Sequence, residues 1–207
     1  MGVKESLSDN KKFLFLTSAL LVVSVIIMFS LNSGLYSPTS PLTNNKGSYT
    51  RPRQFLQDGI DYNITIKTDI GEINIDLYED KAPKNVNSLL FLISERYYEG
   101  LTFHRVIKDF VIQTGDTKGD GSGDPGYAVD LENTGENFSD YTIGMANASQ
   151  FFIVLPNSNK SDFNGFFPVV GRVTRGFSVV DSISKAEVDE DYRPINDIVI
   201  NSIQITE

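Results

Sequence analysis

Residues 103–116 read FHRVIKDFVIQTGD, and they set one arginine, Arg105, among aromatic and β-branched residues. Aromatic and β-branched residues favour extended structure, so this pattern predicts two strands. The polar pair at residues 108–109 interrupts the apolar run and predicts a break between them. The centre of the chain is therefore expected to contain a pair of neighbouring strands.

The arginine in this stretch needs a partner. Residues two apart on a strand share a face, which would orient Phe103 with Arg105, and Val111 with Gln113. A guanidinium on an apolar face loses its hydration unless another group takes up its donors. A buried carboxylate or a bound ligand would serve equally, and local sequence leaves both interpretations open.

Alternating apolar residues predict further strands on both sides of residues 103–116. NITIKT and EINIDLY, joined by residues 69–71, predict a β-hairpin. MANASQFFIVL predicts two strands around a short break, while PVVGRVT and DIVINSIQIT predict two more. In the last of these the isoleucines fall out of phase near residues 201–202, which indicates a β-bulge.

Two segments have a helical pattern. Pro83 stands where a first helical residue is favoured, and Gly100 is expected to end this helix. Its apolar residues recur at helical spacing: Val86, Leu89, Leu90, Ile93 and Tyr97. GFSVVDSISK predicts a second helix. Many short strands with two helices predict a mostly β fold, a closed and mainly antiparallel barrel.

Composition excludes several kinds of chemistry. The chain has 207 residues, no Cys and a single His, His104. Disulfides, thiol catalysis and Cys-ligated zinc are therefore excluded, and a His-built metal site or a Ser/His/Asp triad is not expected. The Gly- and Asp-rich loop at residues 116–124 lacks the spacing of a calcium loop and the ending of a phosphate loop. We expect no metal and no cofactor.

The charge distribution argues against nucleic acid as a partner. The net charge is −9, and the acidic excess lies after residue 57, whereas the preceding residues are basic on balance. A strongly acidic folded part repels phosphate backbones. Solubility in a saline exterior is the explanation that we prefer.

An apolar, uncharged run covers residues 13–31. At about 1.5 Å per residue, a helix of this length spans roughly the hydrocarbon layer of a bilayer. Three lysines precede the run and no charge follows it until Lys46, which predicts a cytoplasmic N-terminus. A cleaved signal peptide, followed by secretion, is the alternative, although residues 32–35 offer a poor cleavage site.

The chain is therefore divided into four parts. Residues 1–12 are predicted to be cytoplasmic, and residues 13–31 to form a single-pass transmembrane helix. Residues 32–57, rich in Ser, Thr, Asn and Pro, are predicted to form a flexible linker. Residues 58–207 form the predicted domain, outside the cytoplasm.

Aromatic residues are frequent in the segments around Arg105. Most are expected in the core, and alternation requires that either Phe151 or Phe152 is a core residue. Others, placed beside Arg105 and Gln113, would line an apolar groove with a few convergent polar groups, which is how a small recognition pocket is built. We assign Phe103 to this groove.

Several separated motifs resemble those of cyclophilin-type peptidyl-prolyl isomerases in order and spacing. They are FHRVIKDFVIQTGD, GDGSGD, MANASQFFI and NGFFPVVGRV, and the opening hairpin and DKAPKNV match as well. The resemblance covers about residue 60 to the C-terminus. It implies a closed eight-stranded antiparallel barrel capped by two helices, and rotation about Xaa-Pro bonds as the reaction.

The resemblance also implies residue roles. Arg105 is similar to the catalytic arginine of that family, and Phe110 and Gln113 are grouped with it. The implied pocket for the proline ring, of which Phe110 is also a part, contains Val111, Phe152, Phe163 and Phe167. The residues implied to hold the peptide backbone, together with Gln113, are Ala146, Asn147, Ala148 and Gln150.

The chain departs from the family pattern at three positions. Val111 stands where Met is usual, Phe167 where His or Tyr is common, and Asp162 where members sensitive to cyclosporin place Trp. Rotation about a peptide bond needs no nucleophile, metal or proton shuttle, so the scarcity of His and Cys is no obstacle.

We therefore expect a membrane-anchored isomerase that assists the folding of extracytoplasmic proteins. Its partners would be proline-containing polypeptides, and its catalytic domain would be monomeric. The alternative is a membrane-tethered module that binds proline-containing segments without turnover, for example as a chaperone. The altered pocket residues favour this alternative, and the retained Arg105 argues against it.

Overall fold

The computed structural model describes residues 48–207. The predictions for residues 1–12 and 13–31, and for the linker up to residue 47, lie outside the described residues. Within residues 48–207, neither α-helix reaches the length and apolarity that a membrane crossing requires.

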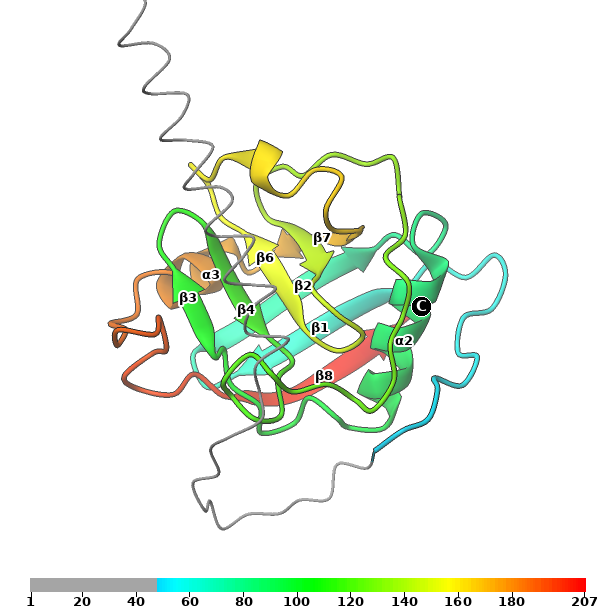
Figure 1. Ribbon diagram of the computed structural model, residues 1–207, viewed down its shortest axis with the longest axis horizontal. Helices are drawn as coiled ribbons and strands as arrows, with labels where there is room; N and C mark the ends of the chain where they lie inside the picture. The colour runs from blue at the N-terminus through cyan, green and yellow to red at the C-terminus, as the bar shows by residue number, and fades with distance from the viewer. Residues whose placement is uncertain (1–47) are drawn as a thin grey trace, which may run out of the picture. The chain divides into compact units, whose positions relative to one another are not determined.

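One sheet of eight antiparallel strands forms the body of the domain (Figure 1). The strands lie in the order β3-β4-β6-β5-β7-β2-β1-β8. In chain order they are β1 (Asn63–Thr68), β2 (Gly71–Leu77), β3 (Arg105–Ile107), β4 (Val111–Thr114), β5 (Thr142–Met145), β6 (Phe151–Val154), β7 (Val169–Arg175) and β8 (Ile200–Thr206).

The sheet is a half-barrel, so the prediction of a closed barrel is wrong. Strands β3 and β8 are its two edges. A single isolated bridge, between Thr102 and Val199, lies between the segments that lead into these strands. Phe103 N–H donates to the Ile198 carbonyl at 3.1 Å, but no ladder follows from this contact. Gly100 N–H also donates to the Ile200 carbonyl, and Ile200 N–H donates to the Leu101 carbonyl. The start of β8 is thus bonded to the segment before β3, but β3 and β8 themselves do not pair.

The predicted strands are present, except that β5 lies before the stretch MANASQFFIVL and shares only Met145 with it. The β1–β2 hairpin turns at residues 69–70, and residues 108–110 separate β3 from β4. Asp109 adopts a left-handed backbone there, with φ 57°, which turns the chain. The register between β1 and β8 shifts opposite Asn201, which is the predicted bulge.

Helix α2 (Pro83–Ser94) begins at the predicted proline but ends earlier than predicted. Arg96 takes a left-handed conformation, with φ 58°. Its N–H donates to the Ile93 carbonyl, and Tyr97 N–H donates to the Leu92 carbonyl at 3.0 Å. This pattern of hydrogen bonds terminates helices, so Tyr97 packs in the core from a turn.

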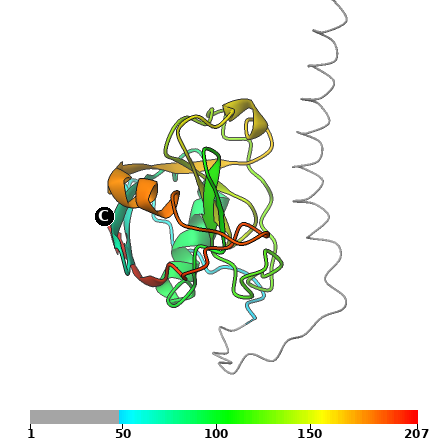
Figure 2. The same cartoon turned by 90° about the vertical axis from the view of Figure 1, so that its left-hand side faces the viewer.

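The second predicted helix is α3 (Phe177–Ile183), and a short 3₁₀ helix, η1, covers Lys160–Asp162. In Figure 1 the two α-helices lie at opposite ends of the sheet, with α2 on the right and α3 on the left. Figure 2, turned by 90°, shows the sheet curving so that β1 and β8 face β3 and β4 across the core.

Strand alternation divides the buried residues into two clusters. Phe151 and Ile153 lie in the main core between the sheet and α2, while Phe152 and Val154 lie on the other face. Both phenylalanines are thus buried, but in different clusters. We call the second set the aromatic cluster: Phe110, Val111, Phe138, Phe152, Val154, Phe163, Phe167 and Val169.

Residues 48–57, the described part of the predicted linker, pack against α2. In Figure 1 this segment is the blue-to-cyan coil beside α2. Its apolar residues Tyr49, Phe55 and Leu56 are partly buried against the main core. The folded unit therefore extends towards the N-terminus beyond residue 58. We call residues 48–57 the strap.

Candidate active site

The candidate site is built on one row of residues that crosses neighbouring strands. Arg105 on β3 is paired with Gln113 on β4, and Gln113 is paired with Phe152 on β6. Phe152 is paired in turn with Gly144 on β5. Directly opposed residues project from the same face of a sheet, so this row brings a cation, an amide and a phenyl ring together.

Arg105 is half-buried, and its Nη1 donates to Gln113 Oε1 at 3.4 Å. Burial lowers the pKa of its guanidinium, and the neighbouring Tyr192 opposes that shift. Within residues 48–207 no carboxylate forms a salt bridge with Arg105. The interpretation of Arg105 as half of a buried ion pair is therefore excluded for this part of the chain, and its charge is available to a ligand.

A relay of amides holds Gln113 in place. Gln113 Nε2 donates to Gln150 Oε1 at 2.9 Å. Gln150 Nε2 then donates to the carbonyls of Gly121 and Gly123, at 3.0 and 2.8 Å. Because Gln150 is only 2% exposed and its amide is fully engaged, it orients Gln113 instead of meeting a ligand with its side chain.

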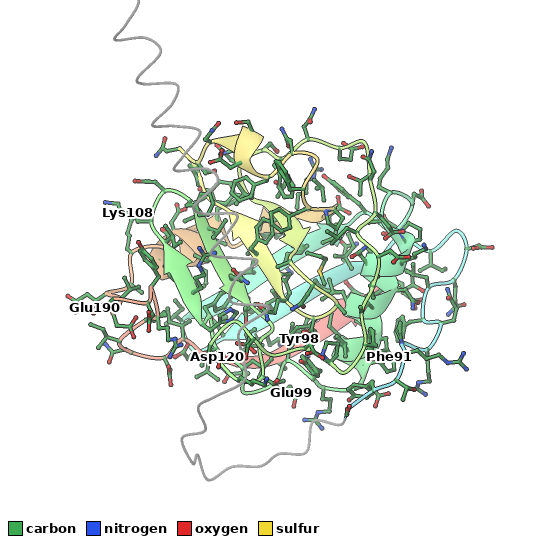
Figure 3. The ribbon with its side chains drawn as sticks, viewed as in Figure 1. Phe91, Tyr98, Glu99, Lys108, Asp120 and Glu190 are labelled. Atoms are coloured by element: carbon green, nitrogen blue, oxygen red, sulfur yellow. The ribbon has the colours of Figure 1, made fainter. Side chains whose placement is uncertain are left out.

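The loop at residues 116–124, singled out by its Gly and Asp content, supports this relay. Asp116 is buried and accepts hydrogen bonds from Lys118 N–H, at 3.0 Å, and from Gly121 N–H. Asp120 lies on this loop at the lower end of the sheet in Figure 3, and Lys108 lies at the other end of the β3–β4 hairpin. The loop thus has a structural function, which is to present carbonyls to Gln150.

Phenyl rings form the wall beside the row. Phe163 stacks on Phe110 with ring centroids 4.9 Å apart, and on Phe152 at 5.5 Å. Phe167 meets Phe152 edge to face at 5.2 Å. Phe110 and Phe167 are only partly buried, so they offer apolar surface at the edge of the cluster. Phe152, the ring that Phe167 meets, is the direct neighbour of Gln113 across β4 and β6.

The fold and this geometry can be compared with known proteins. The family model described as cyclophilin type peptidyl-prolyl cis-trans isomerase/CLD matches residues 63–205. The chain belongs to the cyclophilin-type isomerase family. It is accordingly a peptidyl-prolyl cis-trans isomerase, with a mostly β cyclophilin-like half-barrel and two helices.

Curated cyclophilins share about a third of their residues with this chain. Peptidyl-prolyl cis-trans isomerase-like 3 of Gallus gallus is 36% identical over 156 residues, which cover 69% of this chain and 94% of the relative. Peptidyl-prolyl cis-trans isomerase ppi1 of Schizosaccharomyces pombe is 38% identical over 153 residues, covering 67% and 95%.

Solved cyclophilins have the same fold. A cyclophilin type peptidyl-prolyl cis-trans isomerase of Cryptosporidium parvum superposes with a TM-score of 0.66 at 28% identity, covering 72% of this chain and 99% of that one. The structure of the same protein in the presence of the dipeptide Ala-Pro gives a TM-score of 0.65.

The remaining predicted site residues of this cyclophilin lie in different surroundings. Phe103 is 0% exposed and packs in the main core, because it precedes β3 and does not share the face of Arg105. Val111 is buried within the aromatic cluster, and Ala146 packs against that cluster. The structure therefore places Val111 and Ala146 on the face of the sheet that contains the site, and it places Phe103 on the opposite side, in the main core.

The turn between β5 and β6 contains the other predicted backbone-binding residues. Asn147 Oδ1 accepts hydrogen bonds from the N–H groups of Ser149 and Gln150, at 2.9 and 2.7 Å. Ala148 is buried, and its carbonyl accepts a hydrogen bond from Ser88 Oγ on α2. The side chain of Asn147 thus shapes the turn.

Three contributors to the site were missed by the sequence interpretation. Phe138, 4% exposed, packs its ring at 5.8 Å from Phe152 and 5.4 Å from Phe163. Gly144 leaves room for these rings, because a Cβ there would lie 2.8 Å from the Phe138 ring. Tyr192 accepts a hydrogen bond at its carbonyl from Val106 N–H and so lies beside Arg105. Of these three residues only Phe138 gave a signal in the sequence, because it is a single phenylalanine in a polar loop.

Proposed function

We propose that the chain accelerates rotation about Xaa-Pro bonds in polypeptides that fold outside the cytoplasm, with Arg105 as the catalytic donor. Phe110 and the aromatic cluster would receive the proline ring, and Gln113 would hold the adjoining backbone. The single observation that carries the catalytic part is a half-buried guanidinium without a carboxylate partner among residues 48–207, in one row of the sheet with Gln113 and the Phe152 ring.

The chemistry of the reaction fits that arrangement. The planar amide is held by resonance, with a barrier of about 18–20 kcal/mol. At the twisted transition state the prolyl nitrogen regains its lone pair and becomes a hydrogen-bond acceptor. A donor aimed at that nitrogen binds the twisted form better than the planar form, which is what lowers a barrier.

The apolar wall would strengthen this hydrogen bond. Phenyl rings around the proline exclude water, and electrostatic interactions grow as the local dielectric falls. An acceleration of about 10⁵ requires roughly 7 kcal/mol, at about 1.4 kcal/mol per factor of ten. A charge-assisted hydrogen bond together with positioning is sufficient for this, so no metal or cofactor enters the proposal.

Substrate class and cellular place complete the proposal. The related Cryptosporidium parvum protein was crystallised with the dipeptide Ala-Pro, which supports proline-containing polypeptides as substrates here. The apolar run at residues 13–31 and the lysines before it support a membrane anchor with the domain outside the cytoplasm. Secretion after signal cleavage is the alternative location.

An exchange measurement by NMR on an Ala-Pro peptide tests the catalytic part with the full chain. We expect catalysis by the wild type, and a loss of about 10²- to 10³-fold in kcat/KM in Arg105→Ala, as for the removal of one preorganised donor. Peptide binding is expected to persist in this variant. Arg175→Ala, which removes an exposed arginine at the end of β7, is the matched control and should behave as wild type.

The outcome decides between the enzyme and a module that only binds. If the wild type and Arg105→Ala both leave the uncatalysed exchange rate unchanged, the module interpretation is correct. Location is tested separately by fractionating cells and treating intact cells with protease. A chain in the membrane fraction whose domain is digested from outside supports the anchor, and a shortened chain in the medium supports secretion.

A further inference from the structure

The strap is fixed to α2 by one buried amide. Asn87, 8% exposed, accepts hydrogen bonds at Oδ1 from Phe55 N–H at 2.7 Å and Leu56 N–H at 3.1 Å. Its Nδ2 donates to the Arg53 carbonyl at 2.9 Å. One side chain of the domain therefore makes three hydrogen bonds to a segment that precedes the matched family region, residues 63–205.

The start of the strap also contacts the loop before Tyr127. Tyr49 N–H donates to the Pro125 carbonyl at 2.9 Å. The Tyr49 ring meets Phe91 edge to face at 5.2 Å, and Phe91, labelled on α2 in Figure 3, lies 6.5 Å from the Tyr127 ring. Gly126 permits this close approach, because a Cβ there would lie 2.7 Å from the Tyr49 carbonyl oxygen.

Tyr127 connects this loop to the candidate peptide-binding turn through Ser88. The Tyr127 hydroxyl and Ser88 Oγ are hydrogen-bonded at 2.8 Å. Ser88 Oγ donates to the Ala148 carbonyl at 2.7 Å. Since Oγ carries one hydrogen, its bond to Ala148 makes it the acceptor of the Tyr127 hydroxyl. Ser88 is 0% exposed, so no water replaces either bond cheaply.

We infer that Ser88 and Tyr127 are positioning residues, through which the strap holds the turn at residues 146–150 in its peptide-binding shape. This inference rests on the proposed function, because it takes that turn as the place where the substrate backbone binds. It assigns a role to the strap, which lies outside the matched family region. Loosening the strap or cutting the Tyr127–Ser88–Ala148 connection weakens peptide binding and leaves the chemistry at Arg105 intact.

The test uses the full chain with Ser88→Ala, Tyr127→Phe and Tyr49→Ala. Ser94→Ala is the matched control, since Ser94 lies on the same helix and donates to the Phe91 carbonyl, away from the turn. We expect KM for an Ala-Pro peptide to rise about 3- to 10-fold in Ser88→Ala and Tyr127→Phe, the effect of one lost hydrogen bond, with kcat within about twofold of wild type.

Amide hydrogen exchange gives a readout that does not depend on activity. The N–H groups of Ser149 and Gln150, which bond to Asn147 within the turn, should exchange faster in Ser88→Ala and Tyr127→Phe than in Ser94→Ala. Tyr127→Phe keeps the ring, so it remains informative if Ser88→Ala folds poorly. Equal exchange and equal KM in Tyr127→Phe and the control would overturn the inference.

A double variant tests the strap itself. If Tyr49 acts through Tyr127, the KM of Tyr49→Ala combined with Tyr127→Phe will match the larger single effect, because coupled residues are not additive. Independent, multiplying effects would refute the role of the strap. A wild-type chain without catalysis would overturn the proposed function instead, and the exchange rates would still decide the positioning role.

Discussion

Arg105 and Gln113 face each other across β3 and β4, and the guanidinium donates to the Gln113 amide oxygen at 3.4 Å. The partner is neutral, so it orients the cation without cancelling its charge. A carboxylate at the same position would form a stronger, charge-assisted bond and would draw the donor away from a ligand. The identity of this one residue therefore controls whether the arginine is available.

Gln113→Glu is expected to impair catalysis while preserving the fold. The new carboxylate would hold Arg105 and would also face the Gln150 oxygen that Gln113 now pairs with. We expect kcat/KM for an Ala-Pro peptide to fall about 10- to 100-fold, since a charged hydrogen bond must be broken. NMR exchange measures the rate, and circular dichroism checks the fold. Activity equal to wild type would show that Arg105 is not the donor.

Gly144→Ala should disturb the packing of the aromatic cluster. An added Cβ would meet the rings of Phe152 and Phe138, and must displace them. Overpacking of this kind costs about 1–3 kcal/mol of unfolding free energy. Urea unfolding measures the loss, and KM should rise as well because Phe152 moves. Unchanged unfolding free energy and unchanged KM would contradict the close packing of Phe138 and Phe152 against Gly144.

Tyr98→Phe tests a buried bond behind the peptide-binding turn. The Tyr98 hydroxyl donates to the Ser149 carbonyl at 2.8 Å, and burial raises the pKa of this phenol. Its removal leaves a buried carbonyl unpaired, so the unfolding free energy should fall by about 1–3 kcal/mol. Tyr141→Phe is the control, because the Tyr141 bond to Asp181 is closer to solvent and should contribute less. Equal losses in the two variants would contradict this ranking.

His104 should make stability depend on pH. It is 5% exposed, and its ring nitrogens have no hydrogen-bond partner among residues 48–207. Burial lowers the pKa of His104, Asp116 opposes that shift, and Arg105 adds to it. The unfolded chain, with a pKa near 6.5, therefore takes up a proton first as the pH falls, and stability is lost below about pH 6.5.

Replacement of this histidine checks the direction. His104→Leu removes the titrating group and keeps an apolar side chain in the buried position. Urea unfolding at about pH 7 and about pH 5 should show a smaller loss of stability in the variant than in the wild type. A wild type that is more stable at the lower pH than at the higher one would contradict the predicted sign.

Local pattern was sufficient for most of the fold. The turn at residues 69–70, the break after β3 and the bulge at Asn201 follow from apolar alternation and turn residues, which act over a few positions. The end of α2 depends on the left-handed backbone of Arg96, a residue type that gives no such signal. The open edge between β3 and β8 depends on pairing between distant segments, which periodicity does not contain.

The candidate site was predictable where motif and strand face agree. Strand alternation gave the faces of Arg105 and Gln113, the family resemblance added Phe152, and the structure brings the three into one row of the sheet. Phe103 was placed on the same face as Arg105 by the two-residue rule, which does not apply before β3 begins. Ser88 and Phe138 were missed because their partners are distant in sequence: Ser88 bonds to Ala148, and Phe138 packs on Phe152.

The contacts of the strap bear on how a recombinant fragment should be designed. A protein cut at residue 58 would lack the partners of Asn87 and expose the Phe91 ring that Tyr49 covers. Such a fragment would carry an unpaired amide and a fresh apolar surface, both of which favour self-association during purification. Cloning boundaries for crystallisation or screening should therefore begin at or before Ser48.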